Sequence, residues 1–546
     1  MVRLSPISIA LASGACLSAV CAPALAQTAT VILREGDTLF PGGPTVSAIT
    51  QTGVNHQRGY ALNLTCSDSL SRFWGNFAGG PPAVLRTEGM FGPLVQTGFE
   101  AFFGLGDSNI GYSPSGTGGP VNGFDSVFRD DTPLAVEGDP HPVLDDQFWR
   151  FASRPSITSD GQVWFVGGIS STPGGSTMNR GLFTGGNSET VVLLGGQTVP
   201  GYAQPLNTGT AVDFDFRVSG NGNNYIAPVV LTGATAADSA IVMNGEAATA
   251  GGSVLREGTV IPVSVGGNGT ETYQNFDFMG VTNSGSWLVT GDSNAAAAAD
   301  EFIMLNGAIV LRDGASVDGQ VVQGDIEGAY LNNDGDYAVI WDTAANTIET
   351  LIVNGRILLR EGDAVDFDGD GFPDAGAVLT NFTGISTLTM SDRYSGGVDV
   401  YFVADANVDG VTRGAAYRLR VPVAPALGDL NCDGVVDDAD CEPMTLALID
   451  EETYLAAYPD CNFFAADINA DGKVNSFDVK PFCKLSNATC FLCGCQCDWN
   501  MSESLNSQDF FDFLADFFAG RADYNTDGKT NSQDFFDFLA CFFAGC

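Results

Sequence analysis

The sequence predicts a mainly β protein, a β-propeller of seven blades, followed by a small α-helical tail. Two observations predict the propeller: a β phrase that recurs loosely across residues 30–421, and the lack of useful helical periodicity in the same region. A run of Asp-rich loops after residue 428 predicts the tail. The chain has 546 residues, which is more than one ordinary domain holds.

The repeated phrase is an apolar run of β-favouring residues that stops at an acidic residue and Gly. Between its copies lie alternating segments such as "GQVWFVGGI" and "GDYAVIW", and often a third strand such as "EFIMLNG". Several strands in a unit of roughly 50–60 residues are typical of propeller blades. The copies are "VILREGDTL" (31–39), "VLRTEG" (84–89), "LAVEGDPHP" (134–142), "VVLLGGQTVPG" (191–201), "SVLREGTVIP" (253–262), "IVLRDGASVDG" (309–319) and "ILLREGDAVD" (357–366).

Counting these copies predicts seven blades, with six or eight as alternatives. We expect "VILREG" (31–36) and "AAYRLRV" (415–421) to share one blade and close the ring. An open β-solenoid or two sandwiches would also fit the strand pattern. The phrases resemble the REGD-type repeat regions of uncharacterised secreted bacterial proteins, and this resemblance implies architecture only.

A catalytic constellation is not visible in this region. His56 and His141 are the only histidines, and neither accompanies a nucleophile motif such as G-x-S-x-G. A pair of carboxylates for glycoside hydrolysis stays open, because acids are numerous and spacing selects no pair. We expect the acids of the phrases to form turns at strand ends. The recurring arginines are predicted to pair with neighbouring acids on blade edges: Arg34, Arg256, Arg312 and Arg360.

The N-terminus and the overall charge predict where the protein works. Residues 1–26 resemble a secretory signal peptide, with an A-x-A site at Ala24–Ala26 before Gln27, so we expect a secreted, extracellular or cell-surface protein. No later apolar run reaches 18 residues, which predicts no membrane span. The net charge of −42 argues against a nucleic-acid partner.

One acidic segment of the propeller region, "DFDGDGFPD" (366–374), fits part of a calcium-loop template. Ca²⁺ takes six to eight oxygen ligands, and alternate carboxylates in a tight loop supply them. The loop has no ligand at position 12, where Ala377 stands, so an acidic surface turn is the alternative. The candidate ligands are Asp366, Asp368, Asp370 and Asp374.

Four loops after residue 428 match this template more fully, with side-chain oxygens at positions 1, 3, 5, 9 and 12 and a backbone carbonyl at position 7. The first loop (429–440) supplies Asp429, Asn431, Asp433, Val435, Asp437 and Asp440. The second (467–478) supplies Asp467, Asn469, Asp471, Lys473, Asn475 and Asp478. The third (498–509) keeps Asp498, Asn500, Ser502, Asn506 and Asp509, but Glu503 replaces the turn Gly. The fourth (523–534) supplies Asp523, Asn525, Asp527, Lys529, Asn531 and Asp534.

These loops predict Ca²⁺ as the cofactor, with metal-free acidic turns as the alternative. The third loop has the fewest acids at ligand positions, so we expect it to be the weakest of the four. Paired loops of this form, each followed by a single helix and ending in Asp, resemble type I dockerin modules. The second pair also resembles the Cys-ended dockerin-like tails of secreted planctomycete-type proteins. The resemblance covers two pairs of loops, 429–485 and 498–546.

In the dockerin family the loop–helix pair binds a cohesin module on a scaffold or cell surface, and loop positions 10 and 11 contribute to recognition. The resemblance therefore implies a cohesin-like or other surface partner. It carries partner contacts onto Ser507, Gln508, Ser532 and Gln533. Two departures are the spacing of 38 residues between the first two loops and the many Cys.

The segments "SQDFFDFLADFF" and "SQDFFDFLACFF" predict two helices, each with one apolar face that packs in the module core. The flanking Phe511, Phe518, Phe536 and Phe543 are either core or a partner surface. Most Cys crowd into the tail, which predicts disulfides, with a metal site at 490–497 as the alternative. Cys541, where the first copy has Asp516, is expected in a disulfide, and Cys66 as a free thiol or a dimer contact.

The predicted organisation is therefore a signal peptide (1–26), a propeller (27–421), a Pro-rich linker (422–428), the first loop pair (429–485), a Cys-rich connector (486–497) and the second loop pair (498–546). We interpret the chain as a non-enzymatic binding or structural propeller, with a carbohydrate or protein ligand, attached through its tail. The alternatives are a glycoside hydrolase or polysaccharide lyase delivered by its dockerin, and a self-assembling surface protein.

Overall fold

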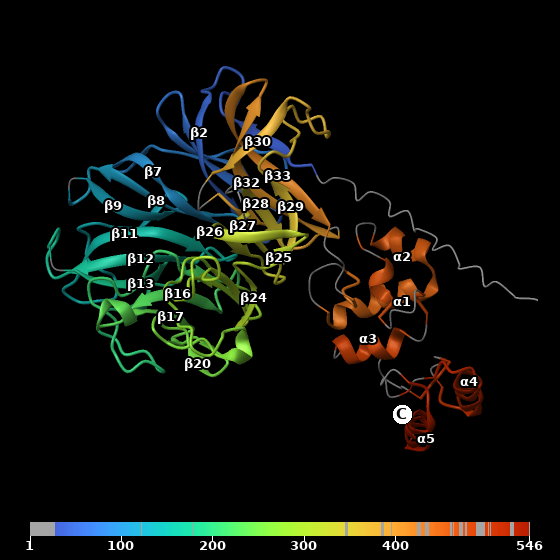
Figure 1. The fold of residues 1–546 in the computed structure, drawn as a ribbon. Coiled ribbons are helices and arrows are strands. Elements are labelled where there is room, and N and C mark those ends of the chain that lie inside the picture. The colour runs from blue at the N-terminus through green and yellow to red at the C-terminus, as the bar shows by residue number, and fades with distance from the viewer. Residues whose placement is uncertain are drawn as a thin grey trace, which may run out of the picture.

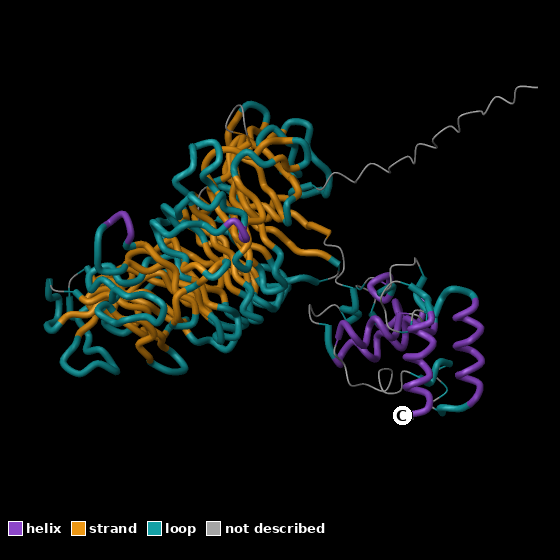
Figure 2. The backbone as a smooth tube through the Cα atoms, turned by 60° about the horizontal axis from the view of Figure 1, so that its bottom comes forward, coloured by secondary structure: helices purple, strands orange, loops and turns teal. Residues whose placement is uncertain are grey.

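The computed structural model describes residues 28–546 apart from 122, 177, 344–347, 384–386, 395, 423–426, 432–435, 459–460, 462, 469–472, 476–477, 487–496, 501, 503, 523, 525–528 and 545–546. The predicted signal peptide, most of the linker and most of the Cys-rich connector lie outside the described residues. Strands form a ring of blades, and helices form the tail (Figures 1 and 2). No helix within the described ranges is long and apolar enough to cross a membrane.

The ring consists of seven antiparallel sheets, as predicted. Blade 1 holds β2 (Val46–Val54), β3 (Tyr60–Cys66), β4 (Ser71–Asn76) and β5 (Ala83–Thr87); blade 2 holds β6 (Met90–Phe91), β7 (Leu94–Leu105), β8 (Ile110–Thr117), β9 (Phe124–Arg129) and β10 (Thr132–Val136). Blade 3 holds β11 (Phe148–Ile157), β12 (Val163–Ser170), β13 (Asn179–Gly185) and β14 (Thr190–Leu194); blade 4 holds β15 (Arg217–Val218), β16 (Tyr225–Val230), β17 (Ser239–Met243) and β18 (Glu246–Ala247).

Blade 5 holds β21 (Met279–Val281), β22 (Trp287–Gly291), β23 (Phe302–Leu305) and β24 (Ala308–Arg312); blade 6 holds β25 (Ser316–Val317), β26 (Gln320–Leu331), β27 (Tyr337–Thr343), β28 (Ile348–Val353) and β29 (Arg356–Arg360). A two-stranded ribbon of β19 (Thr249–Ala250) and β20 (Ser253–Val254) stands between blades 4 and 5. The short 3-10 turns η1 (Thr235–Ala237) and η2 (Val263–Val265) are the only helical elements among the described residues of the ring.

Blade 7 closes the ring with strands from both ends of the propeller. It holds β30 (Ala377–Phe382), β31 (Thr389–Met390), β32 (Gly397–Val408), β33 (Val411–Pro422) and β1 (Thr30–Arg34). Strand β1 pairs antiparallel with β33, with Thr30 opposite Arg418 and Val31 opposite Tyr417. The predicted sharing of one blade by the first phrase and "AAYRLRV" is confirmed.

Local sequence explains how each blade turns. After the inner strand of five blades, a side-chain oxygen accepts a backbone N–H four or five residues on, which fixes a tight turn. The capping residues are Asn55, Thr158, Ser219, Thr282 and Asn332. The strands β17, β23 and β28, in blades 4, 5 and 6, are each followed by Asn-Gly with both residues at positive φ, which suits a two-residue hairpin. These pairs are Asn244-Gly245, Asn306-Gly307 and Asn354-Gly355.

The repeated phrases lie on the outer strands, where they end in turns. Asp37 and Asp363 accept the backbone N–H of Arg34 and Arg360 at 2.9 and 3.0 Å, which confirms acids as turn formers. The side chains of both arginines lie 3.7 Å from the same acids. Arg312 pairs with the buried Glu271. The prediction is wrong for Arg256, whose guanidinium donates instead to Gln204 Oε1 and the Ala237 carbonyl.

The core of the ring lies between neighbouring blades. One cluster joins Ile340 and Leu351 of blade 6 to Phe402 and Tyr417 of blade 7, all at 1% exposure or less. Similar clusters occur between the other blades, so each blade buries both faces. The thiol of Cys66 is buried in blade 1 and free, which removes the prediction of a dimer contact there.

The first half of the tail contains α1 (Cys441–Ile449), α2 (Glu451–Ala457) and α3 (Val479–Ser486), with the 3-10 turns η3 (Asp438–Asp440) and η4 (Phe463–Ala466). The expectation of a single helix after each loop is wrong for the first loop. Asp450 is extended (φ −173°, ψ 160°) between α1 and α2, and its side chain caps α2 by accepting the Thr453 N–H. The additional helix accounts for the long spacing of the first two loops.

The second half of the tail pairs α4 (Ser507–Phe518) with α5 (Ser532–Ala544). Phe513 and Phe538 are fully buried and stack with their ring centroids 3.9 Å apart, which confirms the predicted apolar faces. Cys541 forms a disulfide with Cys497, so the predicted use of Cys541 is confirmed. The flanking Phe511, Phe518, Phe536 and Phe543 are 60–81% exposed and do not belong to the core.

Candidate functional site

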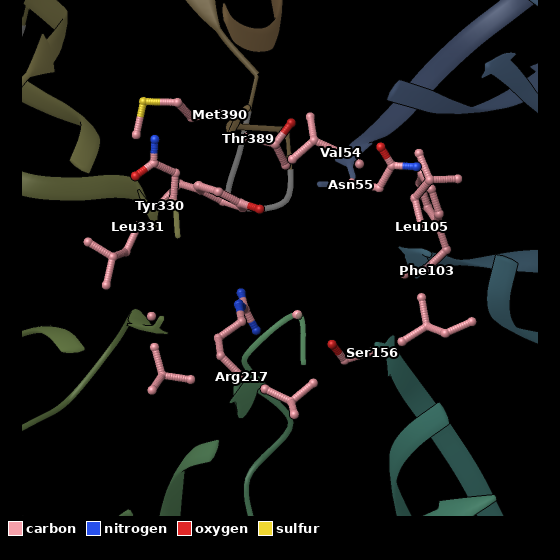
Figure 3. A pocket seen from close by; sticks show the side chains of 18 of the residues that line it. Val54, Asn55, Phe103, Leu105, Ser156, Arg217, Tyr330, Leu331, Thr389 and Met390 are labelled. Carbon is pink, nitrogen blue, oxygen red and sulfur yellow. The ribbon is translucent and has the colours of Figure 1, made fainter. Parts of the chain in front are cut away.

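The seven inner strands surround an axial cavity of about 190 Å³, to which every blade contributes. This is smaller than the roughly 300–1,000 Å³ of common ligand pockets, so it suits a small molecule or the end of a longer one. Apolar side chains such as Val54, Leu105 and Leu331 alternate with polar ones such as Arg217, Tyr330 and Thr389 (Figure 3).

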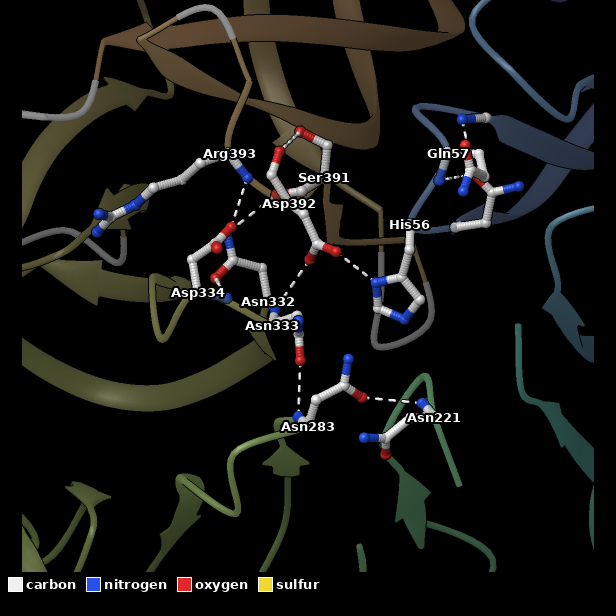
Figure 4. Close-up of polar contacts among 12 residues, drawn as sticks. His56, Gln57, Asn221, Asn283, Asn332, Asn333, Asp334, Ser391, Asp392 and Arg393 are labelled. Atoms are coloured by element: carbon white, nitrogen blue, oxygen red, sulfur yellow. Dashed lines mark hydrogen bonds and ion pairs between the residues drawn. The ribbon is translucent and has the colours of Figure 1, made fainter. Parts of the chain in front are cut away.

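A belt of polar contacts joins five blades at one end of the channel (Figure 4). The Asn221 N–H donates to Asn283 Oδ1 (2.8 Å), and the Asn283 N–H donates to Asn333 Oδ1 (2.6 Å). The Asn333 N–H donates in turn to Asp392 Oδ1 (2.9 Å), and Asp392 Oδ2 contacts His56 Nδ1. All five residues follow inner strands, directly after the turn-capping positions in most blades. The belt therefore holds neighbouring blades in register around the channel.

His56 and Asp392 form the one contact of this belt that pairs two ionisable side chains. Burial lowers the pKa of His56, but the hydrogen bond and the charge of Asp392, with Asp107 and Asp334 further away, outweigh burial and raise the pKa above 6.5. The other histidine behaves in the opposite way. Burial lowers the pKa of His141 to about 4, and its Nδ1 accepts the Val143 and Leu144 N–H groups.

We expect the two histidines to make the free energy of unfolding depend on pH in opposite directions. A raised folded pKa means that the His56–Asp392 contribution is complete below about pH 6.5 and is lost as pH rises through the folded pKa. A lowered folded pKa means that His141 costs stability as pH falls from about 6.5 towards 4. Urea unfolding of the full chain from pH 4 to 9 should show that His56→Gln flattens the alkaline limb and His141→Gln the acidic limb. Equal profiles for His56→Gln and the unchanged chain would contradict this account.

The charges at the channel wall are mostly positive. Arg154 and Arg217 line it, whereas Asp392 is the only carboxylate among the described lining residues. The Arg154 guanidinium stacks over Phe102, 3.1 Å from the ring centroid, and lies 3.5 Å from Asp215. The Arg217 guanidinium donates to the Phe216 carbonyl at 2.9 Å and points into the cavity (Figure 3). In a chain of net charge −42, this wall favours a ligand with acceptor oxygens.

The acidic segment 366–374 forms the compact loop that the template predicts. Carboxylate oxygens of Asp366, Asp368 and Asp374 lie within 4.8 Å of one another, whereas Asp370 is not part of this group. The fully buried Asp366 accepts the N–H groups of Gly369 and Gly371 at 2.7 and 3.0 Å. The residues present fit a hard cation, and calcium at this loop stays a prediction.

Each of the four tail loops has a buried carboxylate at the same position. The Asp at position 12 of each loop is 0% exposed: Asp440, Asp478, Asp509 and Asp534. Each accepts the backbone N–H of the residue at position 9, at 2.7–2.9 Å: Asp437, Asn475, Asn506 and Asn531. Asp437 and Asn506 also cap the following helix, so these two positions have a structural role besides any metal.

The remaining predicted ligands divide between described and undescribed residues. Asp429 and Asp467, at position 1 of their loops, are 7% and 8% exposed. In the third loop the Ser502 N–H reaches Asp498 Oδ1 (2.9 Å) and Asn500 Oδ1 (3.2 Å), so its first three ligand positions converge. Asn431, Lys473 and Lys529 are also described. Asp433, Val435, Asn469, Asp471, Asp523, Asn525 and Asp527 lie outside the described residues.

The predicted partner residues occupy equivalent exposed places on the twin helices. Ser507, Gln508, Ser532 and Gln533 all lie in the first turns of α4 and α5 and are exposed. Gln508 Nε2 donates to Asp512 Oδ1, and Gln533 Nε2 donates to Asp537 Oδ1, both at 2.8 Å. Each of the two helices thus presents the same exposed Gln–Asp contact once.

The sequence did not indicate the channel residues, and it suggested His56 only as a possible catalytic base. A signal was present, since a polar residue follows the turn-capping residue after several inner strands. It was weak because those residues are Asn, Asp, His and Ser, types that also occur in turns without any such role.

No protein-family model matches the chain, and no curated protein does. Similar solved structures include a mutant of the Aleuria aurantia lectin with alpha-methyl-L-fucoside, 11% identical over 62% of this chain and 99% of the lectin (TM-score 0.26). The GH93 alpha-L-arabinofuranosidase of Fusarium graminearum with arabinobiose is 9% identical over 72% of this chain and 97% of that chain (TM-score 0.28). A protein of unknown function from Dyadobacter fermentans is 12% identical over 72% and 98% (TM-score 0.29). At these identities the likeness concerns the fold alone.

Proposed function

We propose that the protein is a secreted, non-enzymatic binding propeller, attached to a surface or extracellular assembly through a calcium-dependent, dockerin-like tail. The observation that supports binding over hydrolysis is the charge of the axial channel. A glycosidase needs two carboxyl groups about 5–10 Å apart that face one substrate. Here one carboxylate lines the described channel, and Asp392 is engaged by His56 and Asn333.

The channel wall favours a small ligand rich in hydroxyl or carboxylate oxygens, such as the terminal residue of an acidic glycan. Arg217 can donate to such oxygens, while Val54, Leu331 and Met390 offer apolar contact. A self-assembling surface protein would use no such channel. A polysaccharide-degrading enzyme would need a pair of catalytic carboxyl groups in this channel, and the described wall supplies one carboxylate.

The ligand half of the proposal is tested by calorimetric titration of the full chain with neutral and uronate mono- and disaccharides. Arg217→Gln should weaken binding at least tenfold, because it removes a charge-assisted donor worth about 1.5–3 kcal/mol. Arg413→Gln changes an exposed arginine of β33 and is the matched control, with unchanged binding expected. Release of new reducing ends from an acidic polysaccharide would contradict the non-enzymatic assignment.

The tail half is tested by capturing secreted and surface proteins on the immobilised full chain, with Ca²⁺ and with chelator. The buried position-12 carboxylates support a loop that needs a cation, so capture should be lost in chelator. The double variant Gln508→Ala, Gln533→Ala should weaken capture, whereas Gln320→Ala, at an exposed Gln of β26 in the propeller, should not. Capture that persists unchanged in chelator would refute calcium-dependent docking.

A further inference from the structure

Blade 5 carries a second group of acids, on the face of the ring opposite the polar belt. In an antiparallel blade the start of the first strand, the end of the second, the start of the third and the end of the fourth meet at one edge. Asp277 precedes β21, Asp292 follows β22, Glu301 precedes β23 and Asp313 follows β24. The topology alone therefore brings four acids from 37 residues of chain to one edge.

The carboxylates converge on one point. Oxygens of Asp277, Asp292 and Glu301 lie within 4.8 Å of one another. The backbone holds them there, because the Asp277 N–H donates to the Thr290 carbonyl (3.1 Å) and the Asp292 N–H donates to the Asn275 carbonyl (3.2 Å). The acids thus stand at the ends of paired strands and cannot move apart without breaking the sheet.

Two of these acids are buried without the donors that a carboxylate needs. Glu301 is 9% exposed and belongs to the converging group, and its Oε2 is buried with no hydrogen-bond partner. Asp313 is 4% exposed, and its Oδ2 is likewise buried without a partner. Burying an unpaired charge is costly, so natural proteins pair such groups or coordinate a metal with them.

The neighbours of Glu301 intensify this need. The other members of the group are carboxylates, so each adds negative charge beside Glu301. The nearby Arg312 is directed to Glu271 instead. No cationic side chain among those described compensates the group.

We propose that Asp277, Asp292 and Glu301 hold a hard divalent cation, Ca²⁺, at the edge of blade 5, with Asp313 behind them. The donor set contains only oxygen, which selects Ca²⁺ or Mg²⁺ over softer metals. Strand ends leave carbonyl groups and solvent to complete a coordination shell of six to eight, which Ca²⁺ accepts more readily than Mg²⁺. The site would fasten three strands of one blade and is independent of the tail loops and of the proposed function.

Hydrogen–deuterium exchange of the full chain, read by mass spectrometry with Ca²⁺ and with chelator, tests this site directly. Peptides that cover 275–301 should exchange at least tenfold more slowly with Ca²⁺, and Mg²⁺ at the same concentration should protect them less. The tail peptides report whether Ca²⁺ is bound elsewhere. Exchange in 275–301 that does not respond to Ca²⁺ would overturn the site.

Variants assign the protection to the carboxylates. Glu301→Gln keeps the shape of the side chain and should abolish the calcium effect in 275–301, with one Ca²⁺ fewer per chain in equilibrium dialysis. Glu189→Gln, at an exposed place beside β14, is the matched control and should behave as the unchanged chain. If Glu301→Gln fails to fold, Asp292→Asn serves as the second variant. Calcium protection that survives in a folded Glu301→Gln protein would overturn the assignment.

Discussion

Replacing Arg393 by Met is expected to lower the free energy of unfolding of the propeller by about 3 kcal/mol. Arg393 Nε and Nη2 donate to the two oxygens of Asp336, both at 2.6 Å, and this pair joins blade 7 to blade 6. The Asp336 side chain is 3% exposed, so the substitution leaves a buried carboxylate without its counter-ion. Removing one partner of a buried pair costs about 3–5 kcal/mol, and the lower end applies because Arg393 is one quarter exposed.

The same substitution at Arg356 provides the matched control. Arg356 pairs with Asp318 at 3.0 Å, but its side chain is 72% exposed, so Arg356→Met should cost less than about 1 kcal/mol. Urea unfolding of the full chain followed by far-ultraviolet circular dichroism measures both. Adding Asp336→Asn to Arg393→Met should recover part of the loss, because it removes the stranded charge. Equal losses for the two single variants would show that burial of the pair contributes nothing.

Replacing Phe513 by Ala is expected to unfold the second half of the tail or to destabilise it by about 3–5 kcal/mol. Phe513 is fully buried, stacks on Phe538 and meets Trp499 edge-to-face at 5.0 Å. The core of this half is small, so one ring is a large share of it. Amides of α4 and α5 should lose roughly a hundredfold or more of their protection from exchange.

Phe518→Ala is the matched control for this prediction. Its ring is 81% exposed, so the same substitution should change exchange in α4 and α5 by less than about threefold. Circular dichroism dominated by the propeller should remain the same in both variants, which confines the effect to the tail. A protected α5 in Phe513→Ala would mean that the Cys497–Cys541 disulfide, and not the stacked rings, holds the module together.

The features predicted correctly are those that local sequence determines. The strand runs and the apolar faces of α4 and α5 each depend on a few neighbouring residues. Ring closure was also predictable, because the strand of the first phrase needed a neighbouring strand to pair with and the last strand of the propeller could supply it. Cys541 stood out because the two helix segments are identical apart from this position, where the first copy has Asp516. Its partner Cys497 could not be chosen from sequence, since many pairings of the tail Cys fit equally well.

The features that were missed depend on contacts between distant residues. His56 and Asp392 are 336 residues apart, and nothing in either neighbourhood indicates the other. The acids of blade 5 look like turn residues until the strand ends are superimposed on one edge. Asp450 reads as one more acid, although its extended backbone divides the helix after the first loop in two. In each case the residue type is a common one, and the residues around it in the folded protein determine its role.

The pairing of β1 with β33 has a consequence for the order of folding. The strand that pairs with β1 supplies residues 415–418, so the first strand of the propeller must wait for this partner through the synthesis of six blades. An unpaired strand edge can meet another chain during that interval, and contacts of such long sequence separation form slowly. The protein therefore completes its ring in one late step. A chaperone that shields β1 would raise the yield of folded propeller more than a chaperone that acts on any middle blade.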